Sequence, residues 1–500
     1  MPYQSLTLPP GIYRNGTQLQ SEGRYFDCNL VRFFQGTIQP EGGWRKKSTS
    51  AVTGKGRAII SWHDNSNSTW SAVGTETNLY AMTRSGVLHD ITPSGFTAGN
   101  ADAAAVGGYG GGTYGSGIYG IPRPDATEIE DADIWTLDTW GEDMVGVMPT
   151  DGIIYQWNLN TAVIAAKVTN SPDCTSLLTT QENILMALAA EGVPRRLKWS
   201  DQEDNTDWTP TATNQAGDLD LPTAGRLMQG IRVKSGNLIL TDLDAHLVSY
   251  TANNLVYSPN KVGSGCGAIS RACAIAIDAA ASVYGAQAVW MSNAGFFIYN
   301  GYVLPLQCDV WDYVFDDLNG LQKSKVTCTI NSAFGEITWR YPSGSSTEID
   351  RRVTWNFREN HWSIGSLPVR YSSVDAGIQS PFPMSVASDG YVYEHECGFV
   401  YDTDVMPFLE SGPMQLGKGD NVQYATQLLP DDLAAGDVSA TFFTKFWPDD
   451  VEATQGPYTI TKQTDVRFGG RQIRVRYDGV NADSWRIGAP RLDITAGGGR

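Results

Sequence analysis

The sequence predicts an all-β protein, a propeller-like array of about five to seven blades with a smaller C-terminal β-domain. Composition is the first reason: aromatics are 11% of the 500 residues, with 15 Trp and 22 Tyr, and charged residues only 18%. The second is turn content, because 53 Gly and 24 Pro punctuate stretches rich in β-branched and aromatic residues. The third is a hairpin outline that recurs along the chain.

Each copy of this outline has an apolar strand, a tight turn rich in Asp, Asn, Ser or Gly, and a second strand with aromatics. From Asp151 onward the turn centres lie roughly 40 to 52 residues apart, which is the blade period of a propeller. A four-stranded blade is expected to be apolar on both faces, so neighbouring blades must cover it and the array must close into a ring. The copies span residues 70–83, 144–158, 184–200, 237–251, 288–301, 336–357 and 384–396.

The same period divides the chain into three parts. Residues 1–50 are an N-terminal docking segment with the first strands, residues 51–400 the propeller, and residues 401–500 a C-terminal β-domain with a Gly-rich tail. A Gly/Tyr-rich insertion at about 93–130 separates the first two hairpins. It lacks apolar periodicity, which predicts a long loop.

Charge and cysteine content narrow the class of protein. A net charge of −18 argues against a protein that binds the phosphates of nucleic acid. The same charge fits both an ordinary soluble protein and the lining of a channel through which DNA passes without binding. We expect no signal peptide and no membrane span, since the most apolar window, 272–290, contains Asp278 and Gln287. The seven Cys are scattered without a C-x-x-C pair, which favours buried free thiols in a reducing cytoplasm.

Motifs for catalysis are missing, so we expect that the protein is not an enzyme and has no catalytic residues, metal or cofactor. The segments 53–57 (TGKGR) and 262–267 (VGSGCG) lack the spacing of a phosphate loop or a nucleophile elbow. The five His do not stand in H-x-x-x-H spacing. In EHEC (394–397), a strand would point His395 away from the two carboxylates.

Residues 201–207 (DQEDNTD) offer the nearest approach to a metal site. They have oxygen ligands at alternate positions like the start of a calcium loop, but the Gly at the sixth position and the acid at the twelfth are missing. The stretch also loosely resembles the Asp-box turn of sialidase-type propellers, without a cluster of three arginines and a Tyr–Glu pair. We favour blade packing for Trp199 and Trp208. The alternate residues are Asp201, Glu203, Asn205 and Asp207.

Three segments carry a resemblance to a known family. Residues 8–46 contain paired prolines, a G-R-Y-F-D-C-N-L-V-R-F strand and a G-G-W-R-K turn. The Gly/Tyr-rich stretch 107–120 and the closing residues 485–500 (WRIGAPRLDITAGGGR) add to the likeness. Together, over about 70 residues, they resemble the tail nozzle, or packaged-DNA stabilisation, proteins of short-tailed bacteriophages, the podophage tail hub.

The resemblance implies a structural virion protein that forms a homo-oligomer, a hexameric ring below the head-to-tail adaptor and portal complex. Such a ring extends the DNA channel, retains the packaged genome and lets it out on ejection. Double-stranded DNA would pass through without sequence-specific binding, and tail fibres or spikes would be further partners. The protein would be assembled in the host cytoplasm and reside in the virion tail.

Two sets of residues would serve this function. Basic residues of the N-terminal segment would dock on the adaptor, since they stand out in an acidic chain. They are Arg14, Arg24, Arg32, Arg45 and Lys46, with Lys47 beside them.

The candidate channel gate consists of Tyr109, Tyr114 and Tyr119, because glycines let several copies converge on an axis where tyrosines stack. The alternatives for this Gly/Tyr-rich stretch are a contact for fibres or spikes and a plain surface loop.

Two other functions share the predicted fold. A carbohydrate-binding or carbohydrate-cleaving β-propeller is the alternative, and it predicts a concave aromatic site with paired carboxylates. A propeller scaffold for protein partners would have the fold without the ring. The phage tail nozzle, in contrast, predicts a ring with an acidic lumen.

Overall fold

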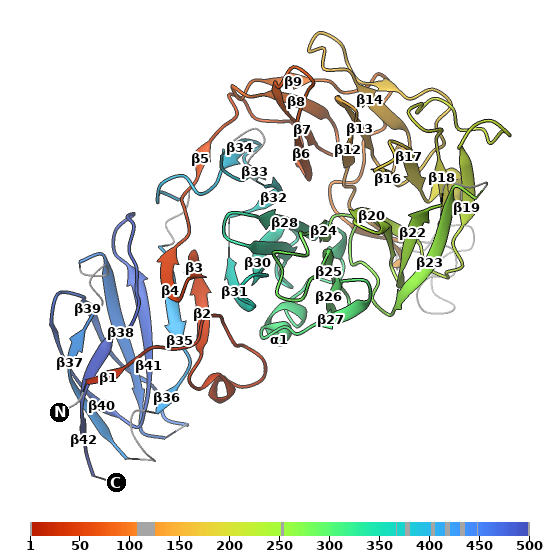
Figure 1. The fold of residues 1–500 in the computed structure, drawn as a ribbon. Coiled ribbons are helices and arrows are strands. Elements are labelled where there is room, and N and C mark those ends of the chain that lie inside the picture. The colour runs from red at the N-terminus through yellow and green to blue at the C-terminus, as the bar shows by residue number, and fades with distance from the viewer. Residues whose placement is uncertain are drawn as a thin grey trace, which may run out of the picture.

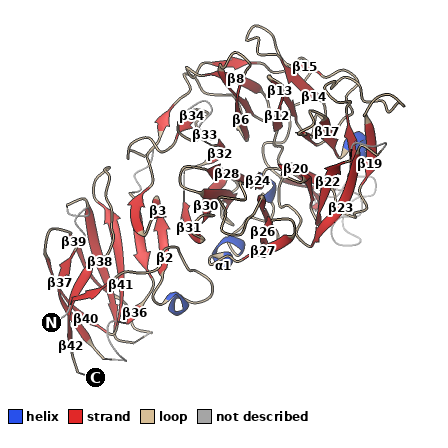
Figure 2. Cartoon of the chain, viewed as in Figure 1, coloured by secondary structure: helices blue, strands red, loops and turns tan. Residues whose placement is uncertain are grey.

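The computed structural model (Figure 1) describes residues 3–107, 126–251, 255–366, 368–375, 381–401, 406–415, 421–430, 436–447 and 449–498. Nearly every element in these ranges is a strand, as Figure 2 shows. The helical elements are α1 (Trp311–Phe315) and the 3-10 turns η1 (Gln18–Ser21), η2 (Ala190–Gly192) and η3 (Lys323–Lys325). The predicted all-β class is confirmed. Within the described ranges, no helix has the length and apolar character needed to cross a membrane.

Seven four-stranded antiparallel sheets form the blades of a propeller (Figure 1). The first strand of each blade is the innermost and contacts the first strands of both neighbouring blades, so the contacts run around the ring without a break. The upper end of the predicted range, seven blades, is the one found.

The blades follow one another along the chain. Blade 1 holds β6 (Ala58–His63), β7 (Thr69–Gly74), β8 (Leu79–Thr83) and β9 (Leu88–Asp90); blade 2 holds β12 (Thr136–Trp140), β13 (Asp143–Val147), β14 (Ile154–Trp157) and β15 (Ala166–Lys167). Blade 3 holds β16 (Ser176–Thr179), β17 (Leu185–Leu188), β18 (Arg196–Trp199) and β19 (Gly217–Asp220); blade 4 holds β20 (Leu227–Val233), β21 (Gly236–Thr241), β22 (Asp244–Tyr250) and β23 (Tyr257–Ser264). Blade 5 holds β24 (Ala274–Ala276), β25 (Ala288–Ser292), β26 (Gly295–Tyr299) and β27 (Val303–Leu306); blade 6 holds β28 (Thr327–Asn331), β29 (Glu336–Pro342), β30 (Ile349–Asn356) and β31 (His361–Ser366). Blade 7 holds β32 (Arg370–Val374), β33 (Met384–Ala387), β34 (Val392–Glu394) and, from the N-terminal segment, β5 (Arg45–Lys46).

The N-terminal segment closes the ring. Strand β5 supplies the outermost strand of blade 7 and pairs antiparallel with β34, with Lys46 opposite Tyr393 and Arg45 opposite Glu394. The Glu394 side chain is buried and forms ion pairs with Arg45 (2.6 Å) and Lys47 (3.1 Å). Strands from both ends of the propeller sequence therefore share one blade, and this pairing fastens blade 7 to the segment that leads into blade 1.

The remaining long strands form two sheets beside the propeller (Figure 1). One sheet has the order β1 (Tyr3–Ser5), β42 (Arg491–Ala496), β37 (Gln423–Leu429), β40 (Thr464–Gly470). The other has the order β2 (Tyr25–Asn29), β35 (Phe408–Ser411), β41 (Gln472–Gly479), β38 (Val438–Lys445), β39 (Ala453–Thr459), and β36 (Met414–Gln415) also pairs with β41. A short hairpin, β3 (Val31–Phe34) and β4 (Thr37–Pro40), follows β2.

Residues 1–50 are thus divided between two domains. Strands β1 and β2 pair with β42 and β35 of the C-terminal domain, whereas β5 belongs to blade 7. The sequence pattern treats 1–50 as a unit of its own, because a pairing between residues several hundred positions apart leaves no local periodicity.

Aromatic side chains fill the core between blades. Phe296 of blade 5 lies 4.7 Å from Trp339 and 4.8 Å from Trp362 of blade 6, measured between ring centroids. Trp199 and Trp208 are buried, and Trp199 meets Tyr257 edge to face, so both pack in the blades. All seven Cys are free, and five of them are buried.

Candidate functional site

The Gly/Tyr-rich insertion connects the outermost strand of blade 1 to the innermost strand of blade 2. Its described part forms an antiparallel hairpin, β10 (Ala104–Gly107) and β11 (Ala126–Glu130), with Ala104 opposite Glu130. Tyr109, Tyr114 and Tyr119, the predicted gate, lie outside the described residues. The structure therefore describes how the insertion is anchored, through residues 91–107 and 126–135, which we call the root.

The root lies at the centre of one face of the propeller. Its partners Arg57, Arg226 and Lys325 stand one or two residues before β6, β20 and β28, which are innermost strands of blades 1, 4 and 6. We call the face at which the innermost strands begin the proximal face. A cavity of about 350 Å³ lies inside the ring of innermost strands, and all seven blades line it. The root is thus attached around the proximal mouth of this central cavity.

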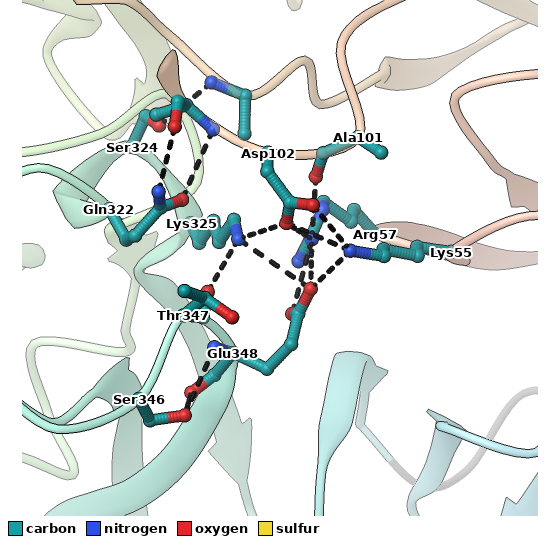
Figure 3. Close-up of polar contacts among 12 residues, drawn as sticks. Lys55, Arg57, Ala101, Asp102, Gln322, Ser324, Lys325, Ser346, Thr347 and Glu348 are labelled. Atoms are coloured by element: carbon teal, nitrogen blue, oxygen red, sulfur yellow. Dashed lines mark hydrogen bonds and ion pairs between the residues drawn. The ribbon is translucent and has the colours of Figure 1, made fainter. Parts of the chain in front are cut away.

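Five charged side chains meet at the root (Figure 3): Lys55, Arg57, Asp102, Lys325 and Glu348. Asp102 Oδ1 lies 2.6 Å from Lys325 Nζ and 2.8 Å from Lys55 Nζ. Glu348 Oε1 lies 2.5 Å from Lys55 Nζ and 3.0 Å from Arg57 Nη2. Since only Asp102 comes from the insertion, this network ties the insertion to blades 1 and 6.

Hydrogen bonds also hold the backbone of the root on both of its sides. The Gln322 side chain donates to the carbonyl of Ala103 (2.8 Å) and accepts from its amide (3.1 Å). Ser324 Oγ accepts from the amide of Ala132 at 3.1 Å, and Arg57 donates to the carbonyl of Ala101 at 2.8 Å. Blade 6 therefore contacts both the departing and the returning strand of the insertion.

The returning strand is also fixed by its own acidic residues. Asp131 forms an ion pair with Arg226 of the blade 4 loop at 2.8 Å. Asp133 accepts hydrogen bonds from the Asn100 amide (2.7 Å) and from Thr150 Oγ1 (2.6 Å). Asp133 thus joins the returning segment to the departing one at Asn100, and Asp131 joins it to blade 4.

The electrostatics of the root suit a permanent link rather than proton transfer. Burial lowers the pKa of Lys325, whereas its hydrogen bond to Asp102 acts to raise it. Burial acts to raise the pKa of Asp102, but the hydrogen bonds from Lys325 and Lys55 outweigh it and hold that pKa well below its usual range. A general acid or base needs a pKa near the working pH. Asp102 is therefore ionised at neutral pH and acts as an ion-pair partner.

The predicted docking residues are all engaged in ion pairs within the chain. Arg45 and Lys46 keep exposed side chains, 64% and 49%, while pairing with Glu394 and Asp389. Arg32 is only 3% exposed, so it cannot meet an adaptor directly, and the prediction is corrected at this residue. The remaining pairs are Arg14 with Asp27, Arg24 with Asp309, and Lys47 with Glu394.

The acidic segment 201–207 uses its side chains to fix a turn. Asp201 accepts from the amide of Gln215 (2.7 Å) and Asp207 from the side chain of Asn214 (2.8 Å). Asn205 donates to Gln156 of blade 2 at 2.8 Å. Over the part of the chain that the structure describes, no three His, Cys, Asp or Glu side chains are grouped so as to hold a metal.

One pair of carboxylates does come together, and the sequence did not reveal it. Glu336 of β29 and Glu396 both bind Arg32, whose Nη2 lies 2.8 Å and 2.5 Å from them. Beside them is a pocket of about 430 Å³ with Phe334, Phe382 and Phe399 in its wall. Although burial acts to raise it, the charge of Arg32 lowers the pKa of Glu396, which does not suit a general acid.

The sequence also gave no indication of the root network. Lys55, Gln322, Lys325 and Glu348 lie in ordinary polar turns, and only the ring brings them together. The one usable signal is positional: Asp102 and Asp131 flank the Gly/Tyr-rich stretch, where an anchoring group is needed.

Comparisons with known proteins find similarity only among solved structures. No protein-family model and no curated protein matches the chain. A streptogramin B lyase matches with a TM-score of 0.38 at 9% identity, over 70% of this chain and 96% of its own. An inactive virginiamycin B lyase from Staphylococcus aureus with quinupristin matches with a TM-score of 0.40 at 6% identity, over 70% of this chain and 98% of its own. An exo-β-1,3-galactanase from Phanerochaete chrysosporium matches with a TM-score of 0.30 at 10% identity, over 91% of this chain and 100% of its own. At these TM-scores the likenesses carry no argument about function, and the propeller assignment rests on the strand pairing.

Proposed function

We propose that this chain is a structural virion protein, the subunit of a phage tail nozzle that extends the DNA channel, retains the packaged genome and releases it on ejection. The observation that carries the proposal is the root: an insertion tied to three blades at the proximal mouth of the propeller. The resemblance of residues 8–46, 107–120 and 485–500 to nozzle proteins supports it from the sequence.

In this function the propeller is a scaffold and the insertion is the working part. A seven-bladed ring closed by β5 is a stiff support, because each blade is held by two neighbours. The ion pairs of Asp102 and Asp131 fix where the hairpin leaves that support. Several copies arranged around an axis would then present their insertions to one another, and the net charge of −18 would keep DNA from sticking to them. No catalytic step is needed, and we propose that the chain is not an enzyme.

Locating the chain in particles tests the proposal. We expect mass spectrometry of purified particles to detect it, and cryo-electron microscopy to place it as a hexameric ring between the adaptor and the fibres or spikes. Absence of the chain from every particle fraction of the cells that produce it would overturn the proposal.

A variant that keeps the root and removes the tip tests the gate. Gly107 and Ala126 are paired in the hairpin register, so residues 108–125 can be replaced by Asn-Gly, the preferred two-residue hairpin turn. We expect the variant to fold and assemble while filled heads lose DNA. Normal DNA retention would reject the gate at Tyr109, Tyr114 and Tyr119. Asp449→Asn, at an exposed position of the C-terminal domain, is the control.

A carbohydrate-binding propeller is the second candidate, favoured by the aromatic pocket that Glu396 lines and by the Glu336 carboxylate that shares Arg32 with it. Aromatic walls beside hydrogen-bonding carboxylates are the usual means of holding a sugar ring. A glycan array with the purified chain tests it. Binding of a defined glycan that Phe334→Ala abolishes, together with absence from particles, would establish this function instead.

A further inference from the structure

Blade 6 turns a polar face toward blade 7, although a blade inside a ring is expected to be apolar on both faces. Ile337, Trp339 and Tyr341 of β29 alternate with Glu336, Thr338 and Arg340, and the polar set faces the opposite side of the sheet. Such a pattern normally belongs to a sheet with one face in water. Here the polar face is also buried: Thr338 is 9% and Arg340 8% exposed.

The opposite wall of this seam, which we call the polar seam, comes from blade 7 and the N-terminal segment. Ser373, Ser385 and His395 face it from blade 7, and Arg32 and Glu41 from the N-terminal segment. Between the walls lies a small, partly open cavity of about 50 Å³. That volume holds one or two particles the size of a water molecule, each of which takes about 30 Å³ in the liquid.

Most charges in the polar seam have partners. Arg32 binds Glu336 and Glu396, and Arg352 Nη1 lies 2.5 Å from the carboxylate of Glu41. The hydroxyls of Thr338 and Thr354 hydrogen-bond to each other at 2.9 Å. Burying polar groups without partners is costly, and these contacts offset that cost.

Arg340 is the exception. Its Nε and Nη1 are buried without a hydrogen-bond partner among the residues that the structure describes, and so is Oγ of Ser373 across the seam. Both residues line the same small cavity. Burial, with Arg352 and Arg370 nearby, lowers the pKa of Arg340 to about 10, so it is still protonated at neutral pH. A guanidinium has only donors to offer, and an unpaired buried cation is strongly unfavourable.

We propose that the cavity of the polar seam binds one small monovalent anion of the chloride class, held by the guanidinium of Arg340 and the hydroxyl of Ser373. Both groups donate, both lack a partner, and they lie on opposite walls of a space that fits one such ion. A water molecule would satisfy the hydroxyl but bring no negative charge to the guanidinium of Arg340. Chloride fits this small space better than sulfate, phosphate esters or sugar carboxylates, which are all larger. The anion would join blade 6 to blade 7 beside the point where β5 closes the ring.

Bromide, which replaces chloride and scatters anomalously, tests the site directly in crystals of the full wild-type chain. We expect one buried anomalous peak between Arg340 and Ser373. A water molecule in the cavity, with bromide found only on the surface or nowhere, would overturn the proposal. This measurement does not depend on whether any variant folds.

Thermal unfolding gives a second test in solution. At equal ionic strength, we expect sodium chloride to raise the Tm of the wild type by about 2 °C over sodium gluconate, whose anion is too bulky to enter. Arg340→Met and the milder Ser373→Ala should reduce or abolish this difference, while Arg84→Met, which removes an exposed arginine of blade 1, should keep it. An equal chloride effect in Ser373→Ala, Arg340→Met and the wild type would overturn the proposal.

Discussion

Nζ of Lys325 lies 2.6 Å from Oδ1 of Asp102, across 223 positions of sequence. The lysine stands two residues before the innermost strand of blade 6, and the aspartate belongs to the insertion between blades 1 and 2. The Lys325 side chain has no exposed surface, whereas that of Asp102 is 47% exposed. A buried cation thus holds a carboxylate at the mouth of the central cavity, and this contact ties the insertion to blade 6.

Removing the charge of Asp102 should loosen the root without unfolding the propeller. We expect Asp102→Asn to speed amide hydrogen exchange in residues 99–107 by about tenfold, because local opening becomes about 1.4 kcal/mol easier. Exchange in the blades should not change. The control is Asp449→Asn, which alters an exposed carboxylate far from the root. Unchanged exchange at 99–107 would show that the hydrogen bonds of Gln322 and Ser324 suffice.

Lys325 and Asp102 should also show coupled energetics. Asp102→Asn leaves a buried ammonium with a weaker partner, Glu348 at 3.5 Å, and we expect a loss of about 1 to 2 kcal/mol. Lys325→Met removes the buried charge, so the double variant should be more stable than Asp102→Asn alone. A double-mutant cycle from urea unfolding measures this. Strictly additive losses would mean that the two side chains do not interact.

The sequence predicted the parts of this fold that repeat locally. Alternating strands, aromatic second strands and a period near that of a propeller blade fixed the class, because each hairpin forms between neighbours in the chain. The pairings of β1 and β2 with the C-terminal domain, and of β5 with β34, were not predictable. They join opposite ends of the chain, and no periodicity records which distant strand a short edge strand will meet.

The site was less predictable than the fold. Arg32 reads as a basic surface residue in an acidic chain, yet it lies between Glu336 and Glu396, and neither carboxylate is near it in sequence. Glu336 and Arg340 stand in a strand whose alternation predicts a water-facing side, but blade 7 covers that side. Local pattern reveals that a face is polar. Only the closed ring reveals that the face is buried.

Acid should weaken the seam between blades 6 and 7 through His395. Burial, together with Arg370, Arg340 and Arg352, holds the pKa of His395 well below its ordinary value. Below about pH 6.5 the unfolded chain takes up a proton that the folded chain refuses, so stability falls with pH by up to about 1.4 kcal/mol per unit. Urea unfolding at pH 7.5, 6.5 and 5.5 measures this.

His395→Gln should reduce that pH dependence, since glutamine does not titrate and can keep a hydrogen bond to Ser385. The buried His361, whose pKa burial also lowers, will still contribute to the remaining slope. His63→Gln changes an exposed histidine and should follow the wild type. Parallel curves for the wild type and His395→Gln would contradict the assignment.

Glu394 should carry much of the closure of the ring, because β5 and β34 share only two residue pairs and such a short ladder holds little by itself. Its side chain is 4% exposed and binds both Arg45 and Lys47. We expect Glu394→Gln to cost about 2 kcal/mol in urea unfolding and to expose the edge of β34 to hydrogen exchange. Asp389→Asn, in the turn that precedes β34, is the matched control, because Asp389 also pairs with a residue of β5. Its ion pair with Lys46 is exposed on both sides, 41% and 49%, so it should cost about 0.5 kcal/mol or less. Equal losses in the two variants would mean that the backbone ladder and the packing of blade 7, rather than the buried carboxylate, keep the propeller closed.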